Sequence, residues 1–572
     1  MLETRKDAEA IGAGIDPITL EIQWQRLITI MDEVDAAVVR TSFSTIVGES
    51  RDFACVMLDA NGDSLAQSTF STPLFTVTLP TTARHLLAEY PVETLAEGDV
   101  LITNNPWFAA GHLPDVSIVT PVFRGGRVVG FMGTVAHVSD IGGRLGYYDA
   151  RDVYEEGLCI PPMKLFRAGE PNEDLFKIVR NNVRVSHMVI GDFRAIVGAQ
   201  WLGAKRFNEF LDDYAIDDLS DLADTIHAVS EAAMRRAIAA LPDGVYPYHL
   251  TADGFAGVAL EIVVAVHVQG DEVLVDFTGS SPEFEVGAIN CVLNNTFADT
   301  IYPFKCSLVP GIPNNTGLFR PVKVVAPEGS VVNTRHPSPV KARSNTDVQN
   351  HHAIYAALED ALGAQVQAGS GSFWGVMAYG VDAEGRRFNN HLLPDGGTGA
   401  LPDRDGMSTM AFPHNKAITP TEIYENTAPL LIERKELLTD SGGAGRFRGG
   451  LGQHIVVASL SDRPISITLR PDKIRFPAPG IAGGQPGSLG RFDLDGEPFD
   501  HRGPFWLHPG LRLSLMLPGG GGYGDPRERD PGAVRSDVAT GYVSPQQAAE
   551  VYGRADQTED DIGTRVSRSG PR

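Results

Sequence analysis

A single β-hairpin, predicted between two short polar motifs, constrains the fold more than any other part of the chain. The motifs are Gly-His-Leu-Pro-Asp at residues 111–115 and Ala-His-Val-Ser-Asp at residues 136–140. Apolar, largely β-branched sequence lies on both sides of Gly125-Gly126, which is typical of two strands joined by a tight turn. Because a hairpin returns its second strand to the start of its first, two imidazoles and two carboxylates are expected to meet at one end.

The register of this hairpin decides which of these side chains share a face. With a plain two-residue loop, Asp115 opposes Ala136, and His137 points to the other face. With a three-residue loop and a bulge, Asp115 opposes His137. The sequence leaves both registers open, although the Gly-Gly pair permits the bulge.

His112, Asp115 and His137 form a candidate metal site. Two neutral imidazoles and one carboxylate, with positions left for water, suit a catalytic Zn²⁺, Mn²⁺ or Fe²⁺ ion. The alternative is that these polar residues cap backbone groups at the ends of strands. Asp140 is a candidate catalytic residue, and two roles are open for it: accepting a proton, or orienting His137 through its other ring nitrogen.

The charge of the chain limits the classes of partner. The formal net charge is −24, and no basic patch emerges, which argues against nucleic acid or an anionic membrane as the main partner. No apolar signal region opens the chain, and no run of about 18 apolar residues occurs. The four cysteines are scattered without a Cys-x-x-Cys motif, as expected of reduced thiols. These features together predict a cytoplasmic protein.

The order of predicted elements indicates a multi-lobed α+β protein, because helices and strands occur in separate blocks. An N-terminal α+β lobe with the hairpin is expected over residues 15–241, and a β-meander with helices over residues 242–430. A β-rich lobe with Gly-rich turns is expected over residues 431–555, and a frayed tail over residues 556–572.

Several nucleotide-binding and hydrolase motifs are absent from the sequence. It contains no Gly-x-x-x-x-Gly-Lys-Ser/Thr motif, no strand–Gly-x-Gly-x-x-Gly–helix unit and no Gly-x-Ser-x-Gly motif. A polyglycine stretch, Gly519–Gly522, leads into Tyr-Gly-Asp-Pro, which cannot begin a phosphate-binding helix. The sequence predicts a flexible turn there, and it supports neither an ATP site nor a serine hydrolase.

An ordered series of motifs extends over about residues 15–555. The segments are residues 51–55, 104–107, 111–115, 140–143, 155–162, 276–280, 326–330, 440–452 and 537–544. As a series they resemble the hydantoinase B / 5-oxoprolinase / acetone carboxylase α-subunit family. In that family's carboxylase α-subunit the metal is held by two His and one Asp, and the matching positions here are His112, Asp115 and His137. The resemblance therefore favours the bulged register.

The resemblance also implies a division of labour between two chains. A separate hydantoinase A-like ATPase subunit phosphorylates the carbonyl oxygen of the substrate, so ATP is used by the partner and not bound by this chain. The present chain then hydrolyses the activated hydantoin, lactam or oxoproline-like ring with a divalent metal (Mn, Zn or Fe), and the two chains form a heterotetramer. The alternative activity is that of the α subunit of an ATP-dependent ketone carboxylase. The alternative that is not an enzyme is a scaffold protein without catalytic activity, which only stabilises its ATPase partner.

Two departures from the family pattern bear on the substrate. Asn105 stands where many members carry Asp, and Phe75 or Thr76 stands where many hydantoinase-like members carry His. The reaction class is therefore expected to transfer to this chain better than the substrate does. Weaker candidates for a role at the site are Arg51, Asp52, Asn104, Asn105, Glu156, Lys164, Asp276, Arg320, Lys341 and Arg343.

Overall fold

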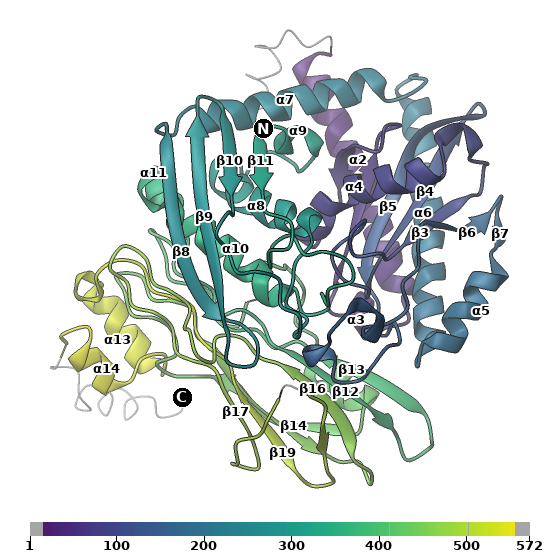
Figure 1. Cartoon of the computed structure of the whole chain (residues 1–572). Helices are drawn as coiled ribbons and strands as arrows, with labels where there is room; N and C mark the ends of the chain where they lie inside the picture. Colours follow the sequence, from purple (N-terminus) through teal and green to yellow (C-terminus); the bar gives the residue numbers. More distant parts are fainter. Residues whose placement is uncertain (1–14, 411, 502, 555–572) are drawn as a thin grey trace, which may run out of the picture.

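The computed structural model describes residues 15–410, 412–501 and 503–554. Within these residues the strands form one seven-stranded and three four-stranded sheets, with helices packed among them. Figure 1 shows the N-terminal elements on the right, the β8–β11 sheet on the left and the later strands below. The predicted α+β class is confirmed, and the predicted tail at residues 556–572 lies outside the described part.

The seven-stranded sheet is antiparallel throughout, and the predicted hairpin, β4–β5, lies near its centre. The strand order is β2-β1-β5-β4-β3-β6-β7. The bounds are β1 (Phe53–Leu58), β2 (Ser64–Gln67), β3 (Val100–Thr103), β4 (Asp115–Arg124), β5 (Arg127–His137), β6 (Met163–Arg167) and β7 (Glu170–Pro171).

Helices cover both faces of this sheet. Gly203 of α6 (Ser186–Asp213) lies against Met132 of β5 and against α2 (Pro17–Thr41), whereas Gly133 lies against α4 (Pro73–Glu89). Successive strand residues point to opposite faces, so α2 and α6 cover one face and α4 the other. His137 shares the face of Gly133, so the candidate site lies on the α4 side. The other helices of this part are α3 (Thr45–Gly48), α5 (Glu173–Asn182) and α7 (Ser220–Ile238).

The central part of the chain contains the predicted meander and a buried helix. The sheet has the order β11-β10-β9-β8, with β8 (Gly244–Asp253), β9 (Ala259–Gln269), β10 (Glu272–Asp276) and β11 (Val322–Val325). The helices are α8 (Leu293–Leu308), α9 (Thr316–Phe319), α10 (Ser344–Ala357) and α11 (Glu359–Leu362). Nearly every residue of α10 is buried, because α10 packs against both α8 and the sheet.

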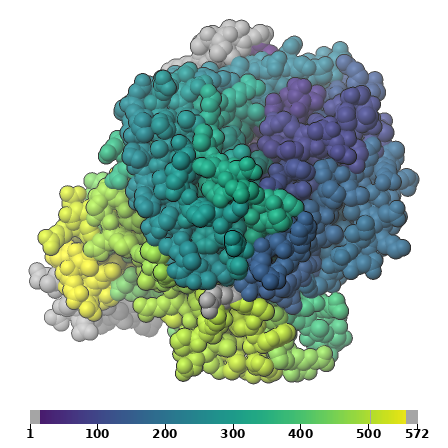
Figure 2. Space-filling model, in the orientation of Figure 1, coloured from purple at the N-terminus to yellow at the C-terminus, as the bar shows by residue number. Residues whose placement is uncertain are grey.

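Two sheets form the lower part of the molecule in Figures 1 and 2. One has the order β13-β12-β16-β18, with β12 (Gly375–Val381), β13 (Arg387–Leu392), β16 (Ile465–Arg470) and β18 (Phe505–Leu507). The other has the order β14-β15-β19-β17, with β14 (Leu430–Leu437), β15 (Gln453–Ser459), β17 (Arg491–Leu494) and β19 (Arg512–Met516). The helices here are α12 (Thr421–Thr427), α13 (Pro531–Ala539) and α14 (Pro545–Glu550). The first of these sheets joins strands from both sides of residue 430, the lobe boundary that the sequence predicts.

Extended glycine-rich segments pack backbone against backbone beside these sheets. We call residues 369–371, 396–399, 441–452, 478–490 and 518–524 the glycine layer. The Gly520 amide donates to Gly450 O at 2.9 Å, and the Gly521 amide donates to Gly369 O at 2.8 Å. The prediction of a flexible turn at Gly519–Gly522 is therefore wrong: these glycines are buried, and each neighbouring segment occupies the space that a side chain would need.

None of the helices in the described ranges has the length and apolar character needed to cross a membrane.

Candidate metal centre

The hairpin β4–β5 brings Asp115 and His137 to one face. Asp115 opens β4 and pairs with His137, which closes β5. The loop has two residues, Gly125 and Gly126, both with positive φ. The register still differs from that of a plain two-residue hairpin, because a bulge follows Val122 on the partner strand, at Val129. The structure thus has the register in which Asp115 opposes His137, but the bulge lies in the strand and not in the loop.

The turn before β4 supplies the third side chain, His112. Gly111 precedes it with φ +94°, and a Cβ there would lie 2.8 Å from Cδ of Arg343. A side chain at residue 111 would therefore be strained and would collide with the arginine. The glycine lets the turn approach Arg343 closely and positions His112 over Asp115.

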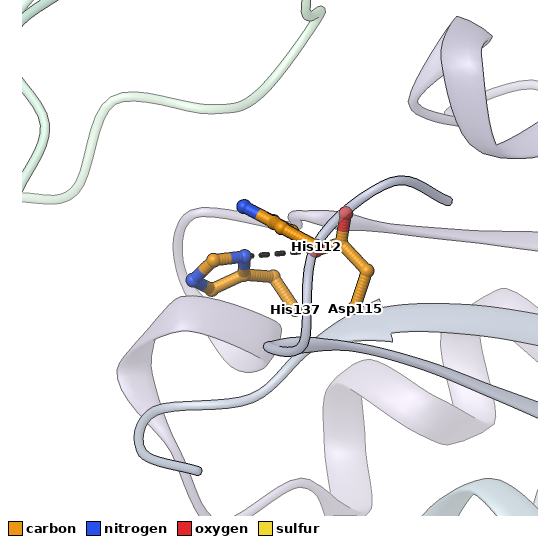
Figure 3. A group of neighbouring side chains, drawn as sticks. All are labelled: His112, Asp115 and His137. Atoms are coloured by element: carbon orange, nitrogen blue, oxygen red, sulfur yellow. Dashed lines mark hydrogen bonds and ion pairs between the residues drawn. The ribbon is translucent and has the colours of Figure 1, made fainter. Parts of the chain in front are cut away.

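One carboxylate oxygen faces both imidazoles. Asp115 Oδ1 lies 2.7 Å from His112 Nε2 and 2.9 Å from His137 Nδ1 (Figure 3). One ligand atom from each of the three residues lies within 4.8 Å of the others. The other oxygen, Oδ2, accepts a hydrogen bond of 2.7 Å from Arg343. Asp115 is fully buried, and both histidines are less than one-tenth exposed.

The surroundings set the charge of each group. Burial alone would raise the pKa of Asp115, but the neighbouring His112, His137 and Arg343 outweigh it and hold the pKa well below its ordinary value. Burial lowers the pKa of His112 to about 4, against the opposing effect of Asp115. At neutral pH the site therefore contains an ionised carboxylate and a neutral His112.

These residues fit a divalent metal. His112 Nδ1 lies 2.9 Å from the carbonyl oxygen of Lys341, which can only accept, so Nδ1 carries the proton. In the neutral ring Nε2 then presents a lone pair to the carboxylate oxygen of Asp115, and two acceptors face each other. A cation held between them removes this repulsion, and two imidazoles with one carboxylate are ordinary ligands of Zn²⁺, Mn²⁺ and Fe²⁺. The bond to Lys341 O is the kind of second contact that orients a ligating histidine.

A cavity of about 1030 Å³, part of it open to solvent, adjoins the three residues. Its wall combines the hairpin end, the start of α4, the segment around α10 and the strands β12, β13 and β16. Basic residues are frequent on it: Arg144, Arg184, Lys341, Arg343 and Arg470. The site is thus enclosed by parts of the chain that are far apart in sequence.

Asp140 lies on the cavity wall and binds Arg184. Its Oδ1 accepts from the Gly142 amide at 3.2 Å and from the Arg184 guanidinium at 3.0 Å, and its Oδ2 accepts from the Arg184 amide at 2.5 Å. Among the described residues, its side-chain hydrogen bonds go to these two partners and none goes to His137. Its assignment as a catalytic residue stays a prediction.

The weaker sequence candidates are divided between the cavity and the scaffold. Lys341, Arg343 and Asp52 line the cavity, and burial raises the pKa of the Asp52 carboxyl. Arg51 pairs with Asp35, and the buried Asn104 side chain bonds the backbone of three loop residues. The remaining candidates lie outside the cavity wall: Asn105, Glu156, Lys164, Asp276 and Arg320.

The polar residues of the cavity that sequence reasoning missed include His391, His414 and Arg470. His391 Nε2 donates to Ser139 O at 2.9 Å, while its Nδ1 is buried without a hydrogen-bond partner, as are both ring nitrogens of His414. Burial lowers the pKa of His391 to about 3, so its ring is neutral. No local motif surrounds these residues, and only the packing of distant segments brings them to the site.

Comparisons with known proteins agree on one family. The model of the family described as hydantoinase B/oxoprolinase matches residues 16–526. A Pseudomonas sp. (strain NS671) protein, named as one of the subunits of a D-/L-hydantoinase, is 33% identical, over 94% of this chain and 95% of its own length. The crystal structure of the ATP-dependent caprolactamase from Pseudomonas jessenii is similar at a TM-score of 0.86 and 28% identity, over 97% of this chain and 100% of the other. A nucleotide-free acetone carboxylase structure shares the fold at a TM-score of 0.85 and 19% identity, over 100% of this chain and 87% of the other.

Proposed function

The chain belongs to the hydantoinase B/oxoprolinase family, and on this premise we propose that it is the metal-dependent hydrolytic subunit of an ATP-dependent cyclic amidase. The substrate is a hydantoin, a lactam or an oxoproline-like ring. The observation that supports this most directly is the ligand set of His112, Asp115 and His137 at the wall of a cavity.

The difficulty of the reaction explains why ATP is needed. An amide resists hydrolysis because its nitrogen lone pair stabilises the carbonyl group. Phosphorylation of the carbonyl oxygen creates a good leaving group and an electrophilic carbon. We propose that a hydantoinase A-like ATPase subunit performs that step, that the two chains form a heterotetramer, and that the present chain completes the hydrolysis. The Pseudomonas relative, whose name makes it one part of a multi-subunit hydantoinase, supports the need for a partner.

His112, Asp115 and His137 are the proposed ligands of a Zn²⁺, Mn²⁺ or Fe²⁺ ion. Such an ion, when bound, supplies Lewis acidity, which polarises a carbonyl group and makes water more acidic. Arg343 fixes Asp115 through Oδ2 and leaves Oδ1 directed at the histidines, while Lys341 O fixes the tautomer of His112. These contacts prepare the ligands before any ion arrives.

Asp140 is the proposed proton acceptor, with a positioning role as its alternative. Three of the roughly four lone-pair sites of its carboxylate are used by Arg184 and Gly142, so about one remains for water. Substitution Asp140→Asn separates the two roles. Loss of a proton acceptor lowers kcat by about 10²–10⁴-fold at unchanged metal content. If Asp140 has a positioning role instead, the substitution disturbs Arg184 and the loop at Gly142–Gly143.

The second candidate is the α subunit of an ATP-dependent ketone carboxylase. The fold shared with acetone carboxylase favours it. The two reactions differ in their co-substrate, because carboxylation consumes bicarbonate or carbon dioxide and hydrolysis consumes water. Incorporation of labelled bicarbonate into product would replace the hydrolase proposal with this one.

The test combines metal analysis with reconstitution. The purified chain is expected to hold about one divalent ion, and the double variant His112→Ala/His137→Ala to hold none. With its ATPase partner, the chain should open a cyclic amide with ATP turnover, and the double variant should not. A metal-free chain, or ring opening by the chain alone without ATP, would contradict the proposal, and the first result would support a scaffold role.

A further inference from the structure

Arg470 is a buried cation on the cavity wall, and no ion pair accounts for its charge. It is the last residue of β16 and is only 6% exposed. Its guanidinium donates to the Ser344 hydroxyl and to Asn345 Oδ1, and lies 4.9 Å from the centre of the Phe373 ring. No carboxylate of the described residues pairs with it, and its buried Nε has no hydrogen-bond partner.

The other three buried arginines of the described chain are all paired. Arg343 binds Asp115 and Asp347, while Arg448 and Arg529 share Asp537. Burying a guanidinium without a counter-charge is unfavourable, because its hydration is lost and not replaced. Arg470, the one buried arginine of the described chain without such a partner, faces the cavity. A ligand in the cavity can therefore supply the missing negative charge.

Further positive groups lie around Arg470. The side chain of Ser344, the first residue of α10, accepts from its guanidinium, so the positive end of a 14-residue helix lies beside it. Lys341 lines the same cavity, and its Nζ has a backbone carbonyl, Glu156 O at 3.0 Å, as its hydrogen-bond partner. A Cβ at Gly375, the residue opposite Arg470 in β12, would lie 3.0 Å from Nε. The absence of a side chain at residue 375 thus leaves room for the guanidinium.

We propose that Arg470, together with Lys341 and beside the positive end of α10, binds an oxoanion of the ligand, namely a phosphoryl group in preference to a carboxylate. A guanidinium and an ammonium offer more donors and more charge than the two oxygens of a carboxylate require. This inference rests on the proposed function, in which the ring reaches the cavity with a phosphoryl group on its carbonyl oxygen. The subsite would hold that group while the carbonyl carbon of the ring is hydrolysed beside the hairpin residues.

The test measures binding of inorganic phosphate and of acetate to the full chain, without the partner and without ATP. Calorimetric titration should give tighter binding of phosphate than of acetate. Arg470→Met should weaken phosphate binding about tenfold or more, and Arg470→Lys, which keeps the charge, should weaken it less. Metal content should stay unchanged in both variants, because Arg470 does not contact the hairpin ligands.

A second readout separates binding from a structural role. Without phosphate, Arg470→Met should melt no lower than the native chain, because the substitution removes an unpaired buried charge. The matched control is Arg529→Met, which should melt lower, because it removes the guanidinium that pairs with Asp405 and that shares Asp537 with Arg448. A lower melting temperature for Arg470→Met, with phosphate binding intact, would assign Arg470 to the scaffold.

Two results would overturn the inference: phosphate affinity that does not change in Arg470→Met, or acetate binding as tight as phosphate binding. Neither depends on the reaction. If the reconstituted enzyme opens no ring but phosphate binding is lost in Arg470→Met, the proposed function fails and the subsite stands. If ring opening proceeds and Arg470→Met leaves both turnover and phosphate binding unchanged, the subsite fails and the function stands.

Discussion

The seven-stranded sheet and the glycine layer bury their backbones in opposite ways. In the sheet, apolar side chains from α2, α6 and α4 fill the space above and below the strands. In the glycine layer the neighbouring backbone itself fills that space: a Cβ at Gly450 would lie 2.0 Å from Met407 O, and one at Gly520 would lie 2.0 Å from Thr398 O. In the sheet, therefore, an apolar residue type indicates a buried position. In the glycine layer, a glycine indicates a buried position, because only a residue without a side chain fits there.

The largest expected effect comes from adding one methyl group to the glycine layer. Gly450→Ala should cost about 4 kcal/mol or more in the free energy of unfolding, because the colliding atoms are backbone and cannot turn aside. Gly198→Ala is the control: Gly198 lies on an exposed part of α6 with no atom within 4 Å of a Cβ, and alanine there should stabilise by about 0.5–1 kcal/mol. Denaturant unfolding measures both. A loss below about 1 kcal/mol in Gly450→Ala would show that the layer adapts as readily as a side-chain core.

The next effect tests the side-chain region at its most charged point. Asp115→Asn keeps the shape of the side chain but leaves Arg343 facing the histidines without a counter-charge on that side. We expect a loss of about 3 kcal/mol in the free energy of unfolding, together with loss of the bound metal. Asp212→Asn, at an exposed pair with Arg124, should change stability by less than about 0.5 kcal/mol and leave the metal in place. Retention of a full equivalent of metal by Asp115→Asn would contradict the assignment of this ligand.

The smallest effect uses pH to compare the glycine layer with α10, a helix that side chains bury. Burial lowers the pKa of His351 in α10 to about 4, so the folded chain keeps this ring neutral where the unfolded chain takes up a proton. Stability should therefore fall as the pH drops from about 6.5 towards about 4, by up to about 1.4 kcal/mol per pH unit for this group. The glycine layer contains no histidine or acidic residue. Hydrogen exchange, corrected for intrinsic rates, should show α10 opening more easily at pH 5 than at pH 7, with the layer changed less.

The control for this prediction is His351→Gln, which removes the titrating ring and should flatten the pH dependence of unfolding. Equal loss of protection in α10 and in the glycine layer at pH 5 would show that acid acts on the whole chain and not through buried histidines.

Much of the fold could be predicted because side-chain patterns carry it. Asp16 and Pro17 begin α2, and a capping residue followed by proline is typical of a helix start, while the alternation of β8–β10 matches the predicted meander. Helix α4 was not predicted, because Pro80 and several threonines interrupt its helical pattern, although most of its residues are buried. Strands β12 and β13 also escaped prediction, since β13 pairs with β12, and β12 in turn pairs with β16, which lies more than 70 residues away in sequence.

The candidate site could be predicted where it is local. The two polar motifs at the ends of one hairpin identify His112, Asp115 and His137, and the structure brings these three together. The bulge at Val129 sets their register, but the Gly-Gly turn gives no sign of its position. Arg470, His391 and His414 could not be predicted, because no spacing in the sequence relates them to the hairpin. Only the packing of the C-terminal strands against the N-terminal sheet does so.

The contrast between the local ligands and their distant supports bears on protein design. Residues 111–137, the hairpin with the turn before it, contain all three proposed ligand side chains, so this segment is a self-contained donor fragment for grafting. Its environment is not portable. The carbonyl that fixes the His112 tautomer and the guanidinium that fixes Asp115 come from Lys341 and Arg343, more than 200 residues later. A graft of the hairpin alone transfers the proposed ligands without the two contacts that orient them. A successful host must therefore supply a carbonyl and a buried cation of its own.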